Sequence, residues 1–339
     1  MTDRPLLSPA GWLYGRITEV RNFLYDRNVF RAADLGKRTI SIGNITAGGT
    51  GKTPVVAKVA EMLLDEGEKV CILTRGYGRA EPRNRVLVSD GNSILADAVS
   101  AGDEPFEIAE KLSGKAVIVA DADRTAAAKW ALEQCDVSVF LLDDGFQHRQ
   151  VKRDLDVVLI DLTDPFGSGM LPAGELREPL RNLRRVDAFI LTRCDLAKSE
   201  GETIRVIREH NTIAPIFTSH NSVKRIRRMN GDECGSPSDP VFAFCGIGNP
   251  DNFLATLENT GITIAAARRY RDHHRYTKRD IDSLIEEAAA NDAKGLITTH
   301  KDSVKLAGLL SDDLPVYIVE IEPIIEPLDD LRDLIFRKF

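Results

Sequence analysis

Short apolar runs alternate with helix-like periodicity along most of the 339-residue chain. Six runs are nearly continuous in apolar residues, as strands buried on both faces are; they cover residues 38–43, 69–73, 116–120, 137–142, 156–160 and 188–192. Helical patterns separate the earlier runs, over residues 54–66, 104–112 and 124–134. This alternation predicts an α/β fold with a three-layer core, in which helices cover a mainly parallel sheet.

The pattern breaks at residues 220–239, which hold a basic cluster followed by glycine and proline with few apolar positions. We interpret this segment as a linker between a first domain, residues 36–219, and a second, residues 240–339. The second part shows strand patterns and helical patterns in alternation, at residues 241–245, 252–259, 263–267, 278–290, 295–298 and 316–320. A smaller α/β domain is therefore expected there.

Residues 1–35 form a separate N-terminal element with a helical pattern over residues 9–31. Apolar residues recur at helical spacing and arginines lie between them; the apolar positions are Trp12, Leu13, Ile17, Val20, Phe23 and Leu24. A basic amphipathic helix of this kind lies in the interface of a bilayer, or it packs on its own domain. The residues alone leave both interpretations open.

Charge and cysteine content narrow the classes of function. The formal net charge of −7 disfavours nucleic-acid binding, because phosphate contacts need an excess of lysine and arginine. Five cysteines without a CxxC pair disfavour a disulfide framework or a zinc site and indicate a reducing compartment. Apolar runs long enough to span a membrane and the features of a signal peptide are both lacking. We therefore expect a cytoplasmic protein.

A glycine-rich segment after the first strand carries the strongest chemical signal. It opens the first helical pattern at Pro54, which is the setting of a phosphate-binding P-loop. Its backbone N–H groups would cradle the phosphates of ATP, Lys52 would reach the β- and γ-phosphates, and the Thr53 hydroxyl would hold Mg²⁺. The predicted nucleotide-binding residues are Thr46, Ala47, Gly48, Gly49, Thr50, Gly51, Lys52 and Thr53. Thr46 stands where the general motif has its first glycine.

The apolar run 137–142 ends in Asp143 and Asp144. In a parallel sheet these carboxylates would lie at the same edge as the P-loop, as a Walker B arrangement requires. Mg²⁺ needs only one or two carboxylates, because it keeps several waters. We therefore predict a magnesium site at Thr53, Asp143 and Asp144, without choosing which aspartate binds the ion directly.

Seven segments together resemble the tetraacyldisaccharide 4′-kinases, over residues 12 to about 305. Each segment is weak by itself, but the ordered set is highly specific; the segments are residues 46–54, 73–78, 102–105, 143–148, 171–179, 272–273 and 299–302. The resemblance implies phosphorylation of the 4′ hydroxyl of a lipid A precursor with ATP. It also implies peripheral contact with an anionic membrane, on the cytoplasmic face of the bacterial inner membrane, and no obligate protein partner.

The resemblance also implies roles for individual residues. Asp103 would accept the proton of the acceptor hydroxyl, and His273 would be its partner. These two come from different expected domains, so we hypothesise that domain closure assembles the base. Other matching or neighbouring positions would face the nucleotide or the acceptor, namely Tyr77, Gln147, His148 and Arg177.

Two other classes of function compete with this interpretation. A nucleotide-gated switch such as a dimeric partitioning ATPase shares the glycine-rich loop but carries lysine where this chain has Ala47. A P-loop kinase of a soluble metabolite would share the loop as well. Such an enzyme would not need the N-terminal amphipathic helix.

Overall fold

A computed structural model describes residues 8–197, 200–229, 231–272, 274–306, 308–309 and 314–337. The chain divides into two compact units. Unit 1 comprises residues Met1–His220 and Ile325–Phe339, and unit 2 comprises residues Asn221–Ile324. Strands β8 (Ile216–Arg228) and β13 (Val316–Glu326) each have residues in both units.

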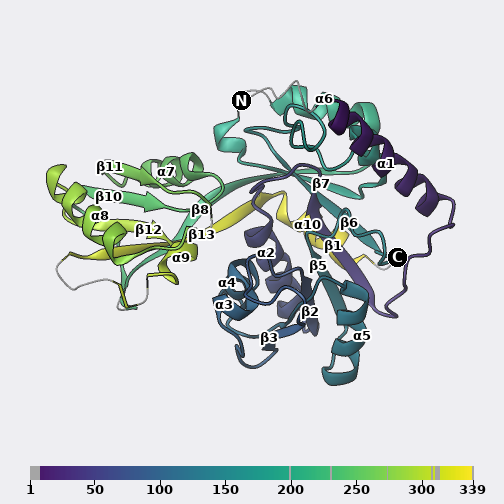
Figure 1. Ribbon diagram of the computed structural model, residues 1–339, viewed down its shortest axis with the longest axis horizontal. Helices are drawn as coiled ribbons and strands as arrows, with labels where there is room; N and C mark the ends of the chain where they lie inside the picture. Colours follow the sequence, from purple (N-terminus) through teal and green to yellow (C-terminus); the bar gives the residue numbers. More distant parts are fainter. Residues whose placement is uncertain are drawn as a thin grey trace. The chain divides into compact units, whose positions relative to one another are not determined.

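Unit 1 holds most of the helices and the longer series of strands (Figure 1). Its elements are α1 (Ser8–Asp26), β1 (Arg38–Asn44), α2 (Lys52–Asp65), β2 (Val70–Thr74), β3 (Val86–Asp90), α3 (Ala98–Ala101), α4 (Asp103–Lys111), β4 (Val117–Ala120), α5 (Arg124–Gln134), β5 (Val139–Asp143), β6 (Leu155–Asp161), the 3₁₀ helix η2 (Leu180–Arg185), β7 (Ala188–Thr192), the 3₁₀ helix η3 (Cys194–Leu196), α6 (Glu200–His210) and α10 (Leu328–Phe336).

The strands of unit 1 follow the order β8-β7-β6-β1-β5-β2-β4-β3. The pairs from β8 to β4 run parallel, and β3 runs antiparallel to β4. One face of the sheet packs on α2, α4 and α10, and the other packs on α5, α6 and η2. The predicted α/β class with a mainly parallel sheet between helical layers is confirmed.

Unit 2 is a smaller α/β unit. Its elements are β9 (Glu233–Cys234), β10 (Val241–Cys245), α7 (Pro250–Asn259), β11 (Ile264–Arg269), α8 (Lys278–Ala290), β12 (Leu296–Thr299) and α9 (His300–Ser303), with most of β8 and β13. The order β11-β10-β12-β13 is parallel throughout. Helix α8 begins with a capping box formed by Thr277 and Asp280.

Two boundaries differ from the sequence-based expectation. The segment 220–239, expected to be a linker, holds most of β8 and the short β9, because Arg225 and Arg227 pair with Glu320 on β13 and so place basic residues in a strand. Residues 325–339, expected in the smaller domain, belong to unit 1. Helix α10 returns there because Leu331 and Ile335 are buried in its core.

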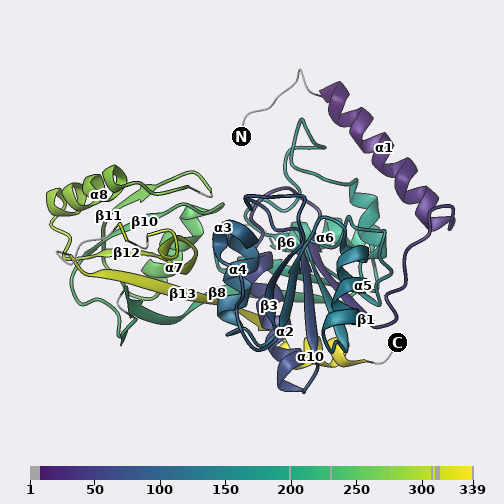
Figure 2. The same cartoon turned by 60° about the horizontal axis from the view of Figure 1, so that its bottom comes forward.

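Helix α1 lies along the outside of unit 1 (Figure 2). Its buried face consists of small or polar residues: Gly11, Gly15, Thr18 and Asn22. A Cβ at Gly11 would come within 2.9 Å of the carbonyl oxygen of Met170, so glycine permits the close packing there. The larger apolar side chains point away from the protein, among them Trp12, Leu13, Ile17, Val20 and Phe23.

Candidate functional site

The predicted phosphate-binding residues form the loop between β1 and α2. Gly48 and Gly51 have φ angles of 117° and 82°, a conformation that side chains with a Cβ rarely adopt. Gly51 is the N-cap of α2, and Lys52 and Thr53 are the first two residues of that helix. The backbone N–H groups at this helix start have no intrahelical acceptor, so the loop is suited to bind an anion.

Two neighbouring segments brace the loop. On one side, Thr46 forms a bridge with Leu176, and the Ala47 N–H donates to the Glu175 carbonyl at 2.7 Å. On the other side, the hydroxyl of Thr192 donates to the Thr50 carbonyl at 3.1 Å.

The side chain of Arg193 adds a second contact on that side. Its guanidinium donates to the Gly49 carbonyl and pairs with Asp161. Burial lowers the pKa of Arg193 to about 10, so it remains charged at neutral pH. Sequence reasoning missed Thr192 and Arg193. These two residues could have been found from their position at the end of the apolar run 188–192, because the ends of parallel strands meet at one edge of a sheet.

Lys52 reaches towards Asp143 and Asp144 at the end of β5, which we call the metal arm. Its Nζ donates to Oδ1 of Asn44 at 3.3 Å and lies 3.6 Å from Oδ1 of Asp144. Asn44 is fully buried and ends β1. Sequence reasoning missed it, although an amide at the end of an otherwise apolar run is a visible signal. The contacts with Asn44 and Asp144 therefore orient the side chain of Lys52 towards the end of β5.

Asp143 and Asp144 lie at the same sheet edge as the loop. Strand β5 pairs with β1 and ends at Asp143, opposite Ile42. The Asp143 carboxylate accepts a hydrogen bond from the Thr74 hydroxyl at 2.8 Å. Burial, and then the negative charges of Glu104 and Asp144, raise the pKa of Asp143 to about 6.

Asp144 has the opposite electrostatic setting. Nη1 of Arg177 donates to both of its carboxylate oxygens, at 2.8 and 2.7 Å. Burial opposes its ionisation, but Lys52 and Arg177 outweigh that effect and hold the pKa of Asp144 below its usual value. The two adjacent carboxylates thus differ. Lys52 and Arg177 stabilise the anionic form of Asp144, whereas neighbouring negative charges disfavour the anionic form of Asp143.

The residues fit a magnesium ion. In the described ranges, no three or more histidine, cysteine or carboxylate side chains are grouped to hold a metal by themselves. Mg²⁺ does not require such a group, because one or two carboxylates and the substrate phosphates suffice. A divalent cation near Asp143 would offset the repulsion among Asp143, Asp144 and Glu104.

Asp103 and Tyr77 lie on adjoining segments. Asp103 is the first residue of α4, and Gly102 before it is the N-cap. A Cβ at Gly102 would collide with the carbonyl oxygen of Tyr77, so the start of α4 packs closely on that loop. The next residue, Glu104, contributes to the raised pKa of the Asp143 carboxyl. Tyr77 itself is exposed, with its ring against Arg75.

Gln147 and His148 follow the aspartate pair, and Gln147 lies at the same edge. Nε2 of Gln147 donates to the Asn44 carbonyl at 2.8 Å, and its Oε1 accepts from Arg177 at 3.4 Å. His148 is half-buried. The predicted residue His273 lies outside the described residues. Its neighbour His274 stacks on Tyr270 in unit 2.

The pKa of His148 gives a prediction for stability. Burial, and then the charges of Arg124 and Arg153, lower this pKa from 6.5 to about 4. The unfolded chain therefore binds the proton below about pH 6.5, whereas the folded chain binds it only below about pH 4. We expect the free energy of unfolding to fall as pH drops through this window, and to fall less steeply in His148→Gln. Urea unfolding at several pH values measures this; equal slopes would contradict it.

A buried carboxylate joins α1 to the segment beside the loop. Glu178 is fully buried and follows Arg177 directly. Its oxygens accept from Asn22 of α1 at 2.8 Å, from Asn182 at 2.9 Å and from both Nη atoms of Arg185 at 2.8 and 3.1 Å. The packing of α1 is thus linked through Glu178 to the residue that grips Asp144.

Helix α1 is also the longest helix of the described chain and carries more of the exposed large apolar side chains than any other element. Trp12 and Ile17 are 67% and 60% exposed. None of the helices in the described ranges has the length and hydrophobicity needed to cross a bilayer.

Comparisons with known proteins agree over nearly the whole chain. The model of the family tetraacyldisaccharide-1-P 4′-kinase (LpxK) matches residues 4–338. A tetraacyldisaccharide 4′-kinase of Geobacter sulfurreducens is 38% identical over 328 residues, which are 96% of this chain and 89% of the relative. One of Anaeromyxobacter dehalogenans is 40% identical over 313 residues, 89% of this chain and 82% of the relative. The crystal structure of LpxK from Aquifex aeolicus in complex with ATP is 33% identical, with a TM-score of 0.78 and 98% of both chains covered.

Proposed function

This chain belongs to the tetraacyldisaccharide-1-P 4′-kinase family, and we propose that it transfers the γ-phosphate of ATP to the 4′ hydroxyl of a tetraacyldisaccharide 1-phosphate. The product is the 1,4′-bisphosphate used in lipid A biosynthesis. The observation that carries the proposal is the placement of Lys52 between the braced P-loop and Asp144.

The loop residues and the metal arm divide the work of phosphoryl transfer. The N–H groups from Gly48 to Thr53 would hold the phosphates, and Lys52 would neutralise charge that builds up on the transferred group. Thr53, Asp143 and Asp144 would hold Mg²⁺, which when bound draws the phosphate oxygens together and offsets their charge. The oxygen of the acceptor attacks the γ-phosphorus while the bond to ADP breaks.

The acceptor proton needs a base, and we assign Asp103 to this role. It lies at the start of α4, which packs closely on the loop of Tyr77, and its neighbour Glu104 contributes to the raised pKa of Asp143. Tyr77, Gln147, His148 and Arg177 would line the path of the sugar. Gln147 and Arg177 contact Asn44 and Asp144 at this sheet edge, which supports the assignment of these two. The role of His273 remains a prediction of the sequence.

Replacing Asp103 tests the base. Asp103→Ala and Asp103→Asn should each lower kcat by roughly 10²-fold, the common scale for loss of a general base, with little change in KM for ATP. The asparagine variant keeps the size of the side chain but cannot take a proton. Steady-state kinetics with the glycolipid acceptor provide the measurement. Near-normal kcat in both variants would remove Asp103 from the mechanism.

Transfer of label tests the activity itself. Purified protein incubated with γ-labelled ATP, Mg²⁺ and tetraacyldisaccharide 1-phosphate should yield labelled bisphosphate that is chromatographically distinct. Release of label only as inorganic phosphate would favour a nucleotide-gated switch. Transfer only to a water-soluble acceptor would favour a kinase of a soluble metabolite.

We further propose that α1 holds the protein on the cytoplasmic face of the bacterial inner membrane. The helix directs small residues inward and large apolar residues outward, the reverse of a helix that packs on its own domain. An apolar helical face flanked by arginines lies favourably in a bilayer interface. Contact with the membrane would bring the site to an acceptor that stays in the bilayer.

A charge on the exposed face of α1 should weaken membrane binding. We expect Ile17→Asp to lower vesicle affinity roughly tenfold or more, because a buried isoleucine contributes about 1.5–3 kcal/mol. The matched control is Ile213→Asp, because Ile213 is 91% exposed elsewhere in unit 1. Flotation with phospholipid vesicles measures both variants. If both variants lost the same vesicle affinity, or if neither lost any, the result would argue against α1 as the anchor.

A further inference from the structure

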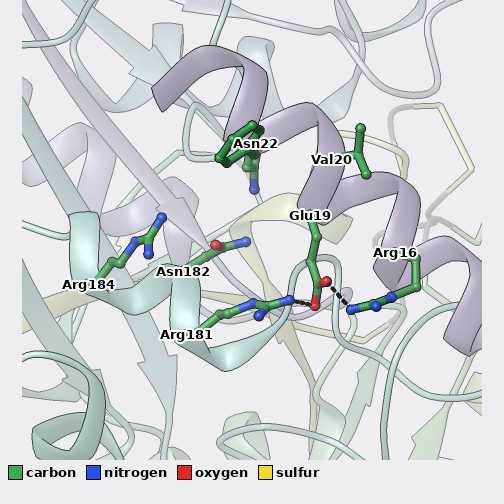
Figure 3. Close-up of a pocket in the computed structure, with 8 residues that line it drawn as sticks. Arg16, Glu19, Val20, Asn22, Arg181, Asn182 and Arg184 are labelled. Carbon is green, nitrogen blue, oxygen red and sulfur yellow. Dashed lines mark hydrogen bonds and ion pairs between the residues drawn. The ribbon is translucent and has the colours of Figure 1, made fainter. Parts of the chain in front are cut away.

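A pocket of about 400 Å³ lies between α1 and η2 (Figure 3). Its lining holds three arginines, Arg16, Arg181 and Arg184, but a single carboxylate, Glu19. The volume is within the range of ~300–1,000 Å³ that small-molecule sites have. The pocket belongs entirely to unit 1 and shares no residue with the P-loop or the metal arm.

The arginines are not saturated by their partners. Arg16 and Arg181 both contact Glu19, so two positive charges share one negative charge. Arg184 pairs with Asp26, which also accepts from Arg149. The three guanidinium-bearing side chains are 60%, 51% and 61% exposed, and exposed ion pairs of this kind contribute little to stability. An incoming anion can therefore displace these contacts at small cost.

Arginine favours one kind of anion. Its planar guanidinium matches phosphate oxygens with two parallel hydrogen bonds, which a lysine ammonium cannot form. The same pocket is lined by Val20 and Phe23, whose exposed faces continue the apolar row of α1. A ligand with its anionic group at the arginines would lie with its apolar part along that row. The pocket thus suits an amphiphile with a phosphate headgroup.

The pocket and the reaction site have different residues, which are linked through Glu178. Asn22 and Asn182, the buried members of the lining, both donate to the buried Glu178. Arg177, which directly precedes Glu178 in the chain, donates to the carboxylate of Asp144. We take the ligand of this pocket to be a lipid other than the one whose hydroxyl reacts, and the kinase assay described below distinguishes the two.

We propose that the pocket between α1 and η2 binds the phosphate headgroup of an anionic membrane phospholipid. This rests on the proposed membrane contact of α1, because the apolar row must enter the bilayer for headgroup phosphates to reach the arginines. The site would fix the depth and direction of α1 at the surface.

The test compares binding to two kinds of vesicle, one of phosphatidylcholine alone and one of equal parts phosphatidylcholine and phosphatidylglycerol. The full-length wild type should bind the anionic vesicles more tightly. R181Q/R184Q should lose roughly tenfold or more of that affinity, since each basic residue near the surface contributes about fivefold. Binding to phosphatidylcholine alone should not change. The control K69Q/R205Q removes the same charge from exposed positions elsewhere in unit 1 and should behave as the wild type.

A second double variant distinguishes a specific site from diffuse electrostatic attraction. R181K/R184K keeps both charges but loses the guanidinium geometry, and it should bind anionic vesicles several-fold more weakly than the wild type. If R181K/R184K bound anionic vesicles as tightly as the wild type does, general electrostatic attraction would replace the proposed site. If the wild type showed no preference for anionic vesicles, the proposal would also be overturned.

The kinase assay separates this proposal from the proposed function. In detergent micelles without phospholipid, R181K/R184K should keep its kcat and its KM for the glycolipid. A several-fold rise in that KM would mean that the pocket holds the phosphate of the acceptor itself, which would overturn the proposal while leaving the kinase activity established.

Discussion

Lys52→Ala should lower kcat for phosphoryl transfer by roughly 10²–10³-fold, the scale for loss of one preorganised charged donor at a transition state. The expectation follows from geometry. Nζ of Lys52 is held by Asn44 and lies 3.6 Å from Asp144, at the mouth of the loop where the phosphates would lie. Its removal would leave the transferred group without this positive charge, and Asp144 would keep only Arg177 as a close cation.

The control for Lys52 lies on the same helix. Lys58→Ala removes a lysine nearly two turns further along α2 and should change kcat by less than about twofold, since surface changes away from a site have small effects. Kinetics at saturating ATP and glycolipid measure both variants. If Lys52→Ala and Lys58→Ala had similar kcat values, the P-loop would not be the site of transfer.

Glu178→Ala should lower the free energy of unfolding of unit 1 by about 3–5 kcal/mol, because it removes one partner of a buried ion pair and leaves Arg185 without its carboxylate. Glu178 is fully buried and accepts hydrogen bonds from α1 and from η2. Glu178→Gln keeps the shape and an acceptor oxygen but not the charge, so its loss should be smaller.

An exposed pair gives the comparison for Glu178. Glu209→Ala breaks the pair of Glu209 with Arg205, whose side chains are more than half exposed, and should cost about 0–1 kcal/mol. Denaturant unfolding measures the variants under one condition. A loss for Glu178→Ala no larger than that for Glu209→Ala would show that the buried network does not stabilise the fold.

The parts of the site that the sequence predicted are those whose signals are local. A strand, closely spaced glycines, Lys52-Thr53 and Pro54 follow one another directly, so the loop and its helix were placed within one or two residues. The aspartate pair was placed as well, because an apolar run ending in carboxylates has one position in a parallel sheet.

The parts that the sequence missed depend on contacts between distant segments. Thr192 and Arg193 brace the P-loop only because β7 lies two strands from β1 in the sheet. Composition indicated a linker at 220–239, but cross-strand pairing with Glu320 keeps those basic residues in β8. For α1 the helix itself was predicted, whereas the face directed towards the protein could be identified only from its packing against Met170.

The assignment of the P-loop edge of the sheet as the phosphotransfer site is tested most directly by a crystal structure with a non-hydrolysable ATP analogue and Mn²⁺. The anomalous signal of Mn²⁺ locates the metal. We expect the triphosphate on the backbone N–H groups of residues 48–53, with Nζ of Lys52 at the γ-phosphate. The metal should lie beside Thr53 and the carboxylates of Asp143 and Asp144. An empty loop, or an anomalous peak distant from both aspartates, would contradict the assignment of this sheet edge as the phosphotransfer site.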